Sequence, residues 1–576
     1  MNDKENIELI QQRIRAARRQ IPSDLVLKKG RVVNVFSGEI LDRDVAVHQG
    51  VIVGVGEDYT GELEVDAQGR YIAPGLIDGH MHVESTMLLP SRLAAALLVH
   101  GTTAIVSDPH EIANVMGVEG IRFMLRESEA LPFDLFVMAP SCVPATSLET
   151  SGASLDQEAL ASLREEPRIL GLAEMMNYPG VLGGDEKVLA KLQLFSGGLI
   201  DGHAPSLKGH DLQAYCSAGI QSDHETSDLQ EAEEKLRAGM MIMIREGTSA
   251  KNLEALVPLV NPKNSRRFCF VTDDLHPEDL LEKGHLDHVL RKAVRLGLDP
   301  LTALQMVTLH PAEHFRLRGR GAVAPGYRAD LVVLENLETF SAERVYKDGR
   351  LVAMAGKICH FPKGKEENLP SWPVRIPPLS VGAFGIRKEG ARARVIEVIP
   401  GQILTRERIE EVLSVKGWVI SDIPKDILKL VVLERHKGTG RIGRGLVHGF
   451  GLQRGALASS VAHDSHNLIA VGVEDIDLIT ALEEVRRMGG GLAVAEGGRI
   501  LAKAALEIGG LMSGEPLESL STQIKTLSRG AKSLGCILPE PFMALSFLSL
   551  PVIPELKLTD RGLVDVRVFA EVPLFV

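Results

Sequence analysis

The 576-residue sequence predicts an α/β fold, in which a (β/α)8 TIM-type barrel is inserted into a small β-sandwich domain and followed by a C-terminal α+β domain. Three observations predict this architecture. Two β-rich segments flank a central stretch of about 240 residues, the central stretch alternates strand and helix patterns, and a proline-rich stretch at 363–378 precedes the last 200 or so residues. An open doubly wound sheet is the alternative, because periodicity alone does not show that a sheet closes.

The flanking β segments predict the two halves of the β-sandwich domain. Residues 24–64 hold short alternating runs broken by glycines, and a similar pattern returns at 326–358. β segments on either side of a long insertion usually pair with each other. The predicted boundaries are 1–73 for an amphipathic N-terminal helix and the first half, 74–315 for the barrel, 316–362 for the second half, and 378–576 for the C-terminal domain.

The central stretch contains eight strand candidates, the number that a closed barrel requires. They read LIDGHMH, TTAIVSDPH, DLFVMAP, RILGLAEMM, GLIDGHAP, IQSDHET, MIMIREG and FCFVTDD. Helical patterns such as IANVMGVEGIRFMLRESEA, DLQEAEEKLRAG and HLDHVLRKAVRLG lie between most of them. This alternation favours a parallel barrel.

Polar residues occur where these strands end, which is where barrel enzymes gather their catalytic groups. His80 and His82 are two residues apart and therefore share one face of the first strand. The other strand ends carry Glu174, His203, His224 with Glu225, and Asp273 with Asp274. Any one of them alone would more often be a helix cap or a solvated loop residue, but their common placement predicts a site.

Four histidines with two carboxylates suit Zn, Fe(II) or Mn and are too rich in nitrogen for Mg or Ca. We expect a two-metal centre in which His80, His82 and Asp273 bind one ion, His203 and His224 bind the other, and Glu174 bridges them. Such a centre activates water, and Asp273 is then placed to pass a proton to a leaving amine. Asp274 is expected to point the opposite way, as neighbours on a strand do.

The C-terminal region carries strand patterns LKLVVLERH and RVIEVIP and the helical pattern DLITALEEVRRMG. Its G-x-G-x-x-G match at 438–443 is not interpreted as a nucleotide site, because strand-like residues follow where a helix would be needed. His463, Asp464 and His466 are candidates for a metal site, although no regular spacing places them on one face. A structural or domain-interface role is favoured for them.

Composition excludes several classes of protein. The net charge of −12 disfavours a nucleic-acid partner, and the lack of an apolar run near 20 residues disfavours a membrane span. Five cysteines scattered singly predict neither disulfides nor a Cys-x-x-Cys zinc site and point to a reducing cytoplasm. The charged N-terminus does not look like a secretory signal.

The histidine pair, the later histidines and Asp273 resemble the metal-dependent amidohydrolase superfamily over residues 24–358. Many members carry a carboxylated lysine where this chain has Glu174. Within the superfamily, the sequence resembles the adenine deaminase family over essentially its whole length. The runs that carry this resemblance are PGLIDGHMHVESTML, SDPHEIANV, LAEMMNYPGV, DGHAP, SDHE, TDD and VAHDSHN.

This resemblance implies hydrolytic deamination of adenine to hypoxanthine and ammonia in purine salvage, with two transition-metal ions, Mn or Fe being favoured and Zn possible. Asp273 and Glu225 are the expected catalytic residues. The expected purine-binding residues are Glu84, His110 and Glu111, with a loop-capping or ligand-orienting role as the alternative for each. We expect adenine and water as partners, and a homo-oligomer, a dimer or larger.

Two other functions stay open at this point. The same ligand set serves other hydrolases of the superfamily, such as guanine deaminase or dihydroorotase. The second alternative is a non-catalytic, dihydropyrimidinase-like interaction protein. Such relatives lose metal-binding positions, whereas here every expected position is filled.

Overall fold

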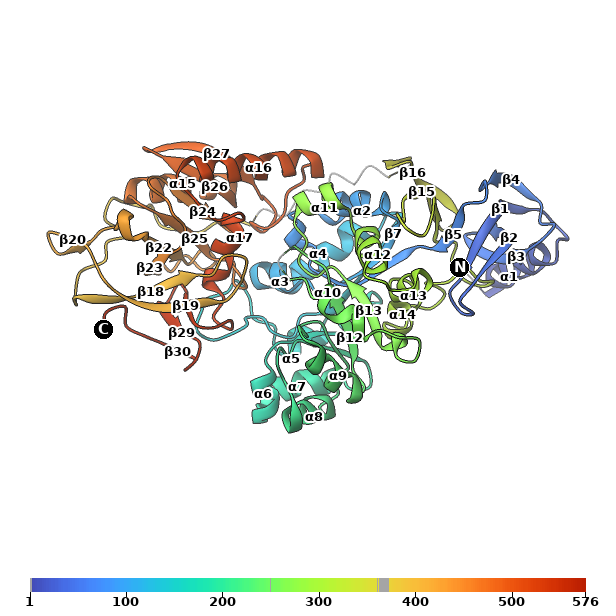
Figure 1. The fold of residues 1–576 in the computed structure, drawn as a ribbon, viewed down its shortest axis with the longest axis horizontal. Coiled ribbons are helices and arrows are strands. Elements are labelled where there is room, and N and C mark those ends of the chain that lie inside the picture. The colour runs from blue at the N-terminus through green and yellow to red at the C-terminus, as the bar shows by residue number, and fades with distance from the viewer. Residues whose placement is uncertain (1–2, 249, 360, 362–371) are drawn as a thin grey trace.

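The computed structural model describes residues 3–248, 250–359, 361 and 372–576. In Figure 1 the chain forms three parts in a row: a β domain that contains the N-terminus, a central barrel, and a C-terminal domain. Residues 363–371 of the predicted proline-rich linker lie outside the described residues.

The two β segments combine into one nine-stranded sheet, as the sequence predicted. Strand β5 pairs antiparallel with β14, so that Ile72 lies opposite Val333 and joins the segments before and after the barrel. Leu27, Val45, Ile72 and Val333 from both segments are buried in one core. The strands are β1 (Ser23–Asn34), β2 (Glu39–His48), β3 (Val51–Gly56), β4 (Gly61–Asp66), β5 (Tyr71–Pro74), β14 (Leu331–Leu334), β15 (Ala342–Lys347), β16 (Arg350–Met354) and β17 (Lys357–Ile358).

Eight parallel strands form the central barrel at the predicted places. They are β6 (Leu76–Met81), β7 (Thr102–Ser107), β8 (Asp134–Ala139), β9 (Ile169–Met175), β10 (Leu199–Gly202), β11 (Ser222–Asp223), β12 (Met241–Arg245) and β13 (Phe268–Val271). Strands β6 to β10 form one hydrogen-bonded sheet and β11 to β13 another.

Two junctions between these sheets close the ring. The Asp273 amide donates to the His80 carbonyl at 3.0 Å beside a parallel bridge from Met81 to Asp273, which joins the last strand to the first. At the other junction the Gln221 amide donates to Ile200. A Cβ on Gly202 would lie 2.4 Å from the Ser222 carbonyl oxygen, so glycine is required for β10 to approach β11.

Helices surround the barrel and cover its apolar outer face (Figure 1). The 19-residue helical pattern after β7 is divided at Gly117, which has a φ of 63° that interrupts the helix. The helices are α2 (Pro90–Leu98), α3 (His110–Met116), α4 (Val118–Ser128), α5 (Gln157–Ala161), α6 (Tyr178–Gly183), α7 (Glu186–Leu194), α8 (Gly209–Ser217), α9 (Leu229–Arg237), α10 (Leu253–Leu256), α11 (Pro277–Lys283), α12 (Leu286–Arg295), α13 (Pro300–Met306) and α14 (Leu309–His314), with α1 (Asp3–Ala17) on the β domain.

The C-terminal domain is α+β, as predicted. Its eight-stranded, mostly antiparallel sheet has the order β19-β18-β23-β22-β25-β24-β26-β27. These strands are β18 (Arg392–Val398), β19 (Thr405–Glu411), β22 (Ile427–Leu433), β23 (Ile442–His448), β24 (Ala456–Ser459), β25 (Leu468–Gly472), β26 (Gly491–Glu496) and β27 (Arg499–Ala505). Its helices are α15 (Asp475–Met488), α16 (Leu517–Ser533) and α17 (Pro541–Ser546), and its short strands are β20 (Ser414–Val415), β21 (Trp418–Val419), β28 (Leu556–Leu558), β29 (Leu563–Asp565) and β30 (Ala570–Glu571).

The glycine-rich match at 438–443 lies in the connection from β22 into β23. A strand follows it, so it lacks the helix N-terminus that binds a dinucleotide. This agrees with the interpretation made from the sequence.

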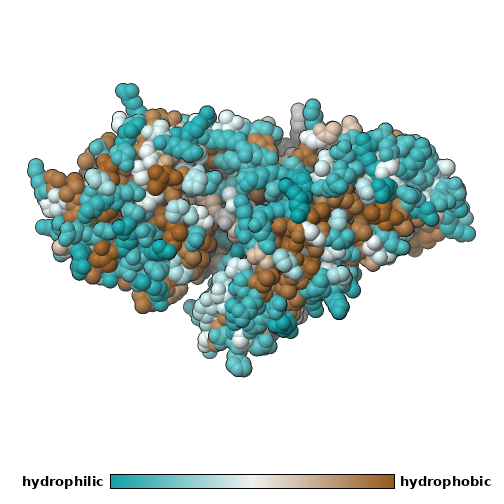
Figure 2. All heavy atoms as spheres, viewed as in Figure 1, coloured by the Kyte–Doolittle hydropathy of each residue, from teal (hydrophilic) through white to brown (hydrophobic). Residues whose placement is uncertain are grey.

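The C-terminal domain is attached to the barrel mouth by backbone hydrogen bonds. The Ser513 amide donates to Met87 at 2.8 Å and the Leu89 amide donates to Ser513 at 3.2 Å. Figure 2 shows a mainly hydrophilic face with separate hydrophobic patches and a notch between the C-terminal domain and the lower barrel helices. Across the described ranges, no helix combines the length and apolar character needed to cross a membrane.

Candidate active site

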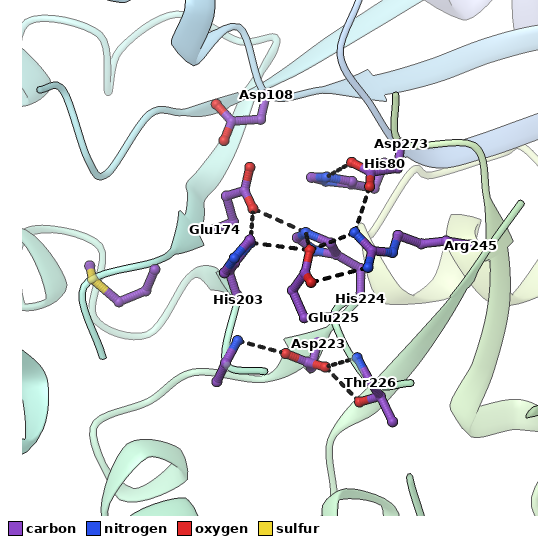
Figure 3. Close-up of polar contacts among 12 residues, drawn as sticks. His80, Asp108, Glu174, His203, Asp223, His224, Glu225, Thr226, Arg245 and Asp273 are labelled. Carbon is purple, nitrogen blue, oxygen red and sulfur yellow. Dashed lines mark hydrogen bonds and ion pairs between the residues drawn. The ribbon is translucent and has the colours of Figure 1, made fainter. Parts of the chain in front are cut away.

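The residues predicted from strand ends converge at one end of the barrel (Figure 3). His80 lies in β6 and Glu174 in β9, whereas His82, His203, His224 and Asp273 lie in the segments that follow β6, β10, β11 and β13. The ring of His80 stacks on that of His224 with centroids 4.1 Å apart. Residues far apart in the sequence thus share one buried site.

The first of two ligand clusters contains His80, His82 and Asp273. Oδ1 of Asp273 is 3.4 Å from Nε2 of His80 and 3.1 Å from Nε2 of His82. Nδ1 of His82 lies 2.9 Å from the Asp108 carbonyl oxygen, which fixes its ring with Nε2 facing the cluster. Three buried donor atoms therefore face one point.

The second cluster is arranged around Glu174. Its Oε2 lies 2.7 Å from Nδ1 of His203 and 3.0 Å from Nε2 of His224. Its Oε1 lies 3.6 Å from Nε2 of His82, in the first cluster. The carboxylate of Glu174 therefore extends from one cluster to the other.

Buried aspartates hold the strand ends that carry these ligands. Asp223 accepts hydrogen bonds from the Ala204 and Thr226 amides, at 2.9 Å each, and from Lys235. Burial opposes ionisation of Asp223, but Lys235, His224 and Thr226 together outweigh it and lower the pKa of the carboxyl to about 2. Asp78 in the same way accepts from the His80 amide and from the side chain of Thr272.

The charges of the site keep Glu174 ionised, whereas burial raises the pKa of Glu111 well above its ordinary value. Burial would raise the pKa of Glu174, but His224 and His203 outweigh it and hold that pKa well below its ordinary value. Burial would lower the pKa of His203, but Glu225 and Glu174 raise it to about 9. Such concentrated charge within a buried cleft is typical of a catalytic or metal centre.

The residues fit divalent transition-metal ions. Among several buried sets with three ligand atoms within 4.8 Å of one another, two share His80: His80, His82 and Asp273, and His80, Glu174 and His224. Nε2 of His80 is buried without a hydrogen-bond partner among the described residues. A buried imidazole nitrogen without a partner is costly in a protein interior and is accounted for by a bound cation.

Arg245 was not predicted from the sequence. It ends β12, and its Nη1 donates to Oδ2 of Asp273 at 2.7 Å while its Nη2 donates to Oε2 of Glu225 at 3.0 Å. The only sequence signal was a charged residue at the end of the seventh strand pattern, which looks the same as a solvated arginine. Arg245 thereby connects the two predicted catalytic carboxylates.

The expected position of Asp274 was wrong. Strand β13 ends at Val271 and Asp273 has a left-handed backbone with φ of 59°, so strand alternation does not apply to the two residues. The side chain of Asp274 accepts a hydrogen bond from Ser85, and both aspartates line the same cavity.

The three expected purine-binding residues lie beside the ligand clusters and are buried. Nδ1 of His110 is 3.3 Å from Asp108 and 3.5 Å from Oε1 of Glu174. Glu111 lines the cavity with His110, whereas Oε1 of Glu84 accepts from the Ile112 amide at 3.0 Å and lines a smaller adjoining hollow. Glu84 thus has the capping contact that the sequence analysis weighed as the alternative.

The cavity over the clusters has a volume of about 330 Å³ and walls from two domains. The C-terminal domain contributes residues 401–404, His463, Asp464 and Phe547, with Leu550, Val552 and Ile553. The ring of His463 stacks on Phe547 with centroids 4.4 Å apart and an interplanar angle of 11°. His463 and Asp464 therefore lie at the domain interface, the location that the sequence analysis favoured.

Comparison with known proteins covers nearly the whole chain. The model of the amidohydrolase family matches residues 71–352, and that of the adenine deaminase C-terminal domain matches residues 402–570. An adenine deaminase of Desulfatibacillum aliphaticivorans is 51% identical over 568 residues, covering 98% of this chain and 99% of that one. Adenine deaminases of Dehalococcoides mccartyi (49%, covering 98% and 99%) and Geobacillus kaustophilus (47%, covering 97% and 98%) are similar over comparable lengths.

Proposed function

The chain belongs to the adenine deaminase family, and from this premise we propose that it hydrolyses adenine to hypoxanthine and ammonia in the cavity at the barrel mouth. Similarity over 98% of the chain to relatives with this activity in their names supports adenine over guanine or dihydroorotate. The same similarity, with the filled ligand positions, disfavours a non-catalytic interaction protein.

The proposed metal ligands are His80, His82 and Asp273 for one divalent ion and His203 and His224 for a second, with Glu174 shared. The observation that carries this assignment is that the two carboxylate oxygens of Glu174 face different clusters. Oε2 faces His203 and His224, and Oε1 faces His82. Bound ions of this kind lower the pKa of water toward neutrality and so supply a nucleophile.

We assign the proton transfer to Asp273. The amine of adenine must be protonated before it leaves, because amide ion is far too basic to depart, and a carboxylate beside the reacting carbon can carry that proton. Arg245, His80 and His82 together outweigh burial and hold the pKa of Asp273 well below its ordinary value. The carboxylate therefore starts as a proton acceptor. Glu225, held by the same guanidinium, is the second proposed catalytic residue.

Adenine would occupy the cavity with its amine toward the ligand clusters. The volume of about 330 Å³ is at the small end of ligand pockets, as a single purine base requires. His110 and Glu111 are the proposed polar contacts inside the cavity. Glu84 supports them indirectly, because it accepts a hydrogen bond from the Ile112 amide of helix α3.

Several finer features belong to the same proposal. Mn or Fe is favoured as the metal and Zn is possible, since nitrogen-rich ligand sets suit all three. Five unpaired cysteines support a cytoplasmic location, with a role in purine salvage. Exposed isoleucines along α1 (Ile7, Ile10 and Ile14) support a homo-oligomer.

Substrate profiling tests this function. Purified protein loaded with Mn²⁺ is incubated with adenine, guanine, dihydroorotate or hydantoin, and ammonia and products are quantified. We expect hypoxanthine and ammonia in equal amounts from adenine and at least 100-fold lower kcat/KM for the others. Preferred turnover of guanine or dihydroorotate would refute the assignment.

A further inference from the structure

Glu111 is the meeting point of the barrel and two histidines of the C-terminal domain. Its Oε1 lies 3.7 Å from Nδ1 of His463, and its Oε2 lies 3.8 Å from Nε2 of His466. Glu111 is 1% exposed and His466 is fully buried. The barrel residue Glu111 is therefore buried against two imidazoles of the C-terminal domain.

Hydrogen bonding fixes the tautomer of His466. The Ala462 amide donates to Nδ1 of His466 at 3.2 Å, so Nδ1 must present its lone pair. Burial first, and the neighbouring His463 and Arg435 second, hold the pKa of His466 well below its ordinary value, so the ring is neutral. A neutral ring with an accepting Nδ1 carries its proton on Nε2, which faces Glu111.

The two facing atoms have no other partner. Oε2 of Glu111 and Nε2 of His466 are both buried without a hydrogen bond among the described residues. Their 3.8 Å separation exceeds a hydrogen bond, but such contacts in empty active sites often shorten when substrate binds. An N–H directed at a carboxylate orients it strongly where water is excluded.

A cation between Glu111, His463 and His466 is the competing explanation, since the three ligand atoms lie within 4.8 Å of one another. A metal at Nε2 of His466 would move the ring proton to Nδ1. Two N–H groups would then face each other at 3.2 Å, because Nδ1 points at the Ala462 amide. The tautomer therefore favours a hydrogen-bond donor over a metal ligand.

The loop that carries His466 is fixed from both sides. The side chain of the buried Arg435 donates to the His466 carbonyl and, at 2.8 Å, to the Gly509 carbonyl. On the barrel side, the side-chain amide of Asn467 donates to the Thr150 carbonyl at 2.9 Å. His466 is thus held rigidly relative to Glu111.

The other oxygen of Glu111 is left for the cavity. Oγ of Ser85, whose proton goes to Asp274, lies 3.3 Å from Oε1, and Glu111 and His463 both line the cavity. We propose that His466 is a positioning residue through which the C-terminal domain orients Glu111 for binding of the substrate base. This inference rests on the proposed function and gives the C-terminal domain a part in substrate binding.

The test uses full-length protein loaded with Mn²⁺ and compares His466→Leu, which removes the donor, with His466→Gln, whose amide replaces it at the Nε2 position. We expect His466→Leu to raise KM for adenine about 10- to 100-fold, the effect of leaving a buried acceptor without its donor, with kcat and metal content nearly unchanged. His466→Gln should retain a KM within about threefold of wild type. His448→Leu is the control, because His448 lies in the same domain against Arg408 and away from the cavity.

A second background separates positioning from general damage. In a Glu111→Leu protein, which lacks the acceptor, adding His466→Leu should change KM by less than about threefold. If His466→Leu does not fold, His466→Asn, whose short amide does not reach the Nε2 position, provides the same comparison with Gln.

Distinct outcomes would overturn the inference. They are an unchanged KM in His466→Leu, a full additional effect in the Glu111→Leu background, or loss of a metal equivalent that accompanies the substitution. Failure of the wild type to deaminate adenine would refute the proposed function and this inference with it. Adenine turnover with an unchanged KM in His466→Leu would refute the inference alone.

Discussion

Nη1 of Arg245 donates a hydrogen bond to Oδ2 of Asp273 over 2.7 Å, while Oδ1 of the same carboxylate lies 3.1 Å from Nε2 of His82. One oxygen of the Asp273 carboxylate thus contacts a guanidinium, and the other faces the ligand histidines. Burial favours the neutral acid, and Arg245 is the largest of the opposing influences that keep Asp273 ionised.

Replacing Arg245 by Met should therefore raise the pKa of Asp273. Activity requires the ionised carboxylate and is lost as the pH falls through its pKa, so the acidic limb of the kcat/KM profile should move to higher pH. We expect kcat/KM near neutrality to fall about 100-fold, because Glu225 loses its partner as well. Arg245→Lys keeps the charge but cannot bind both carboxylates in the same way, so its kcat/KM should lie between those of the wild type and Arg245→Met. A wild-type pH profile in Arg245→Met would contradict this role.

Glu174→Gln tests the shared carboxylate. The amide keeps the size of the side chain but loses the charge that offsets two cations, so metal content should fall and turnover should drop at least about 100-fold. Metal is measured by elemental analysis after dialysis. Glu165→Gln, exposed on the surface before β9, is the matched control. Full metal content together with full turnover would eliminate the bridging assignment.

Phe547 forms the aromatic wall that the C-terminal domain contributes to the cavity, stacked on His463. Phe547→Ala should raise KM for adenine about tenfold with a smaller change in kcat, since it removes apolar contact from substrate and transition state alike. Phe569→Ala is the control, because Phe569 is half exposed and does not line the cavity. Equal KM values for the two variants would show that Phe547 does not contact the base.

Lys557 is a fully buried lysine that donates to the Ile403 carbonyl at 2.9 Å and to the Phe547 carbonyl at 3.0 Å, behind the cavity wall. Burial lowers its pKa to about 7, against 10.5 for an ordinary lysine. Between these values the unfolded chain binds a proton that the folded protein releases. The free energy of unfolding therefore rises with pH across this window and loses that contribution as the pH falls toward 7.

Lys557→Met should lack this pH dependence. Between about pH 7.5 and pH 9 we expect the wild type to gain on the variant by roughly 1 kcal/mol per pH unit, with a constant difference below about pH 6. Chemical unfolding of both proteins over a pH series measures the difference. Parallel curves would mean that Lys557 keeps its ordinary pKa in the folded protein.

The sequence predicted the parts of the site that depend on local pattern. His80, Glu174 and His224 could be placed because each lies at or directly after the end of a strand, and parallel strands of a barrel end on the same side. The relation of Asp273 to Asp274 could not, because the chain leaves β13 before them and turns left-handed. Arg245 looked the same as a solvated arginine, since its role depends on two carboxylates from other segments.

The part of the cavity wall that the C-terminal domain contributes could not be predicted from the sequence, for a different reason. Phe547 and His466 reach the barrel mouth only because distant segments pair, as Leu89 does with Ser513. Local periodicity carries no information on such packing between domains. The C-terminal domain could be recognised as α+β, whereas its share in the cavity could not.

Metal removal and reconstitution test the central claim most directly. The protein is stripped with a chelator, titrated with Mn²⁺, and assayed for conversion of adenine to hypoxanthine at each metal content. Activity should be lost in the stripped protein and return in proportion to bound Mn²⁺ up to two ions per chain, with no gain beyond that. Unreduced adenine turnover by the metal-free protein, or none in protein carrying two ions, would contradict a metal-dependent adenine deaminase.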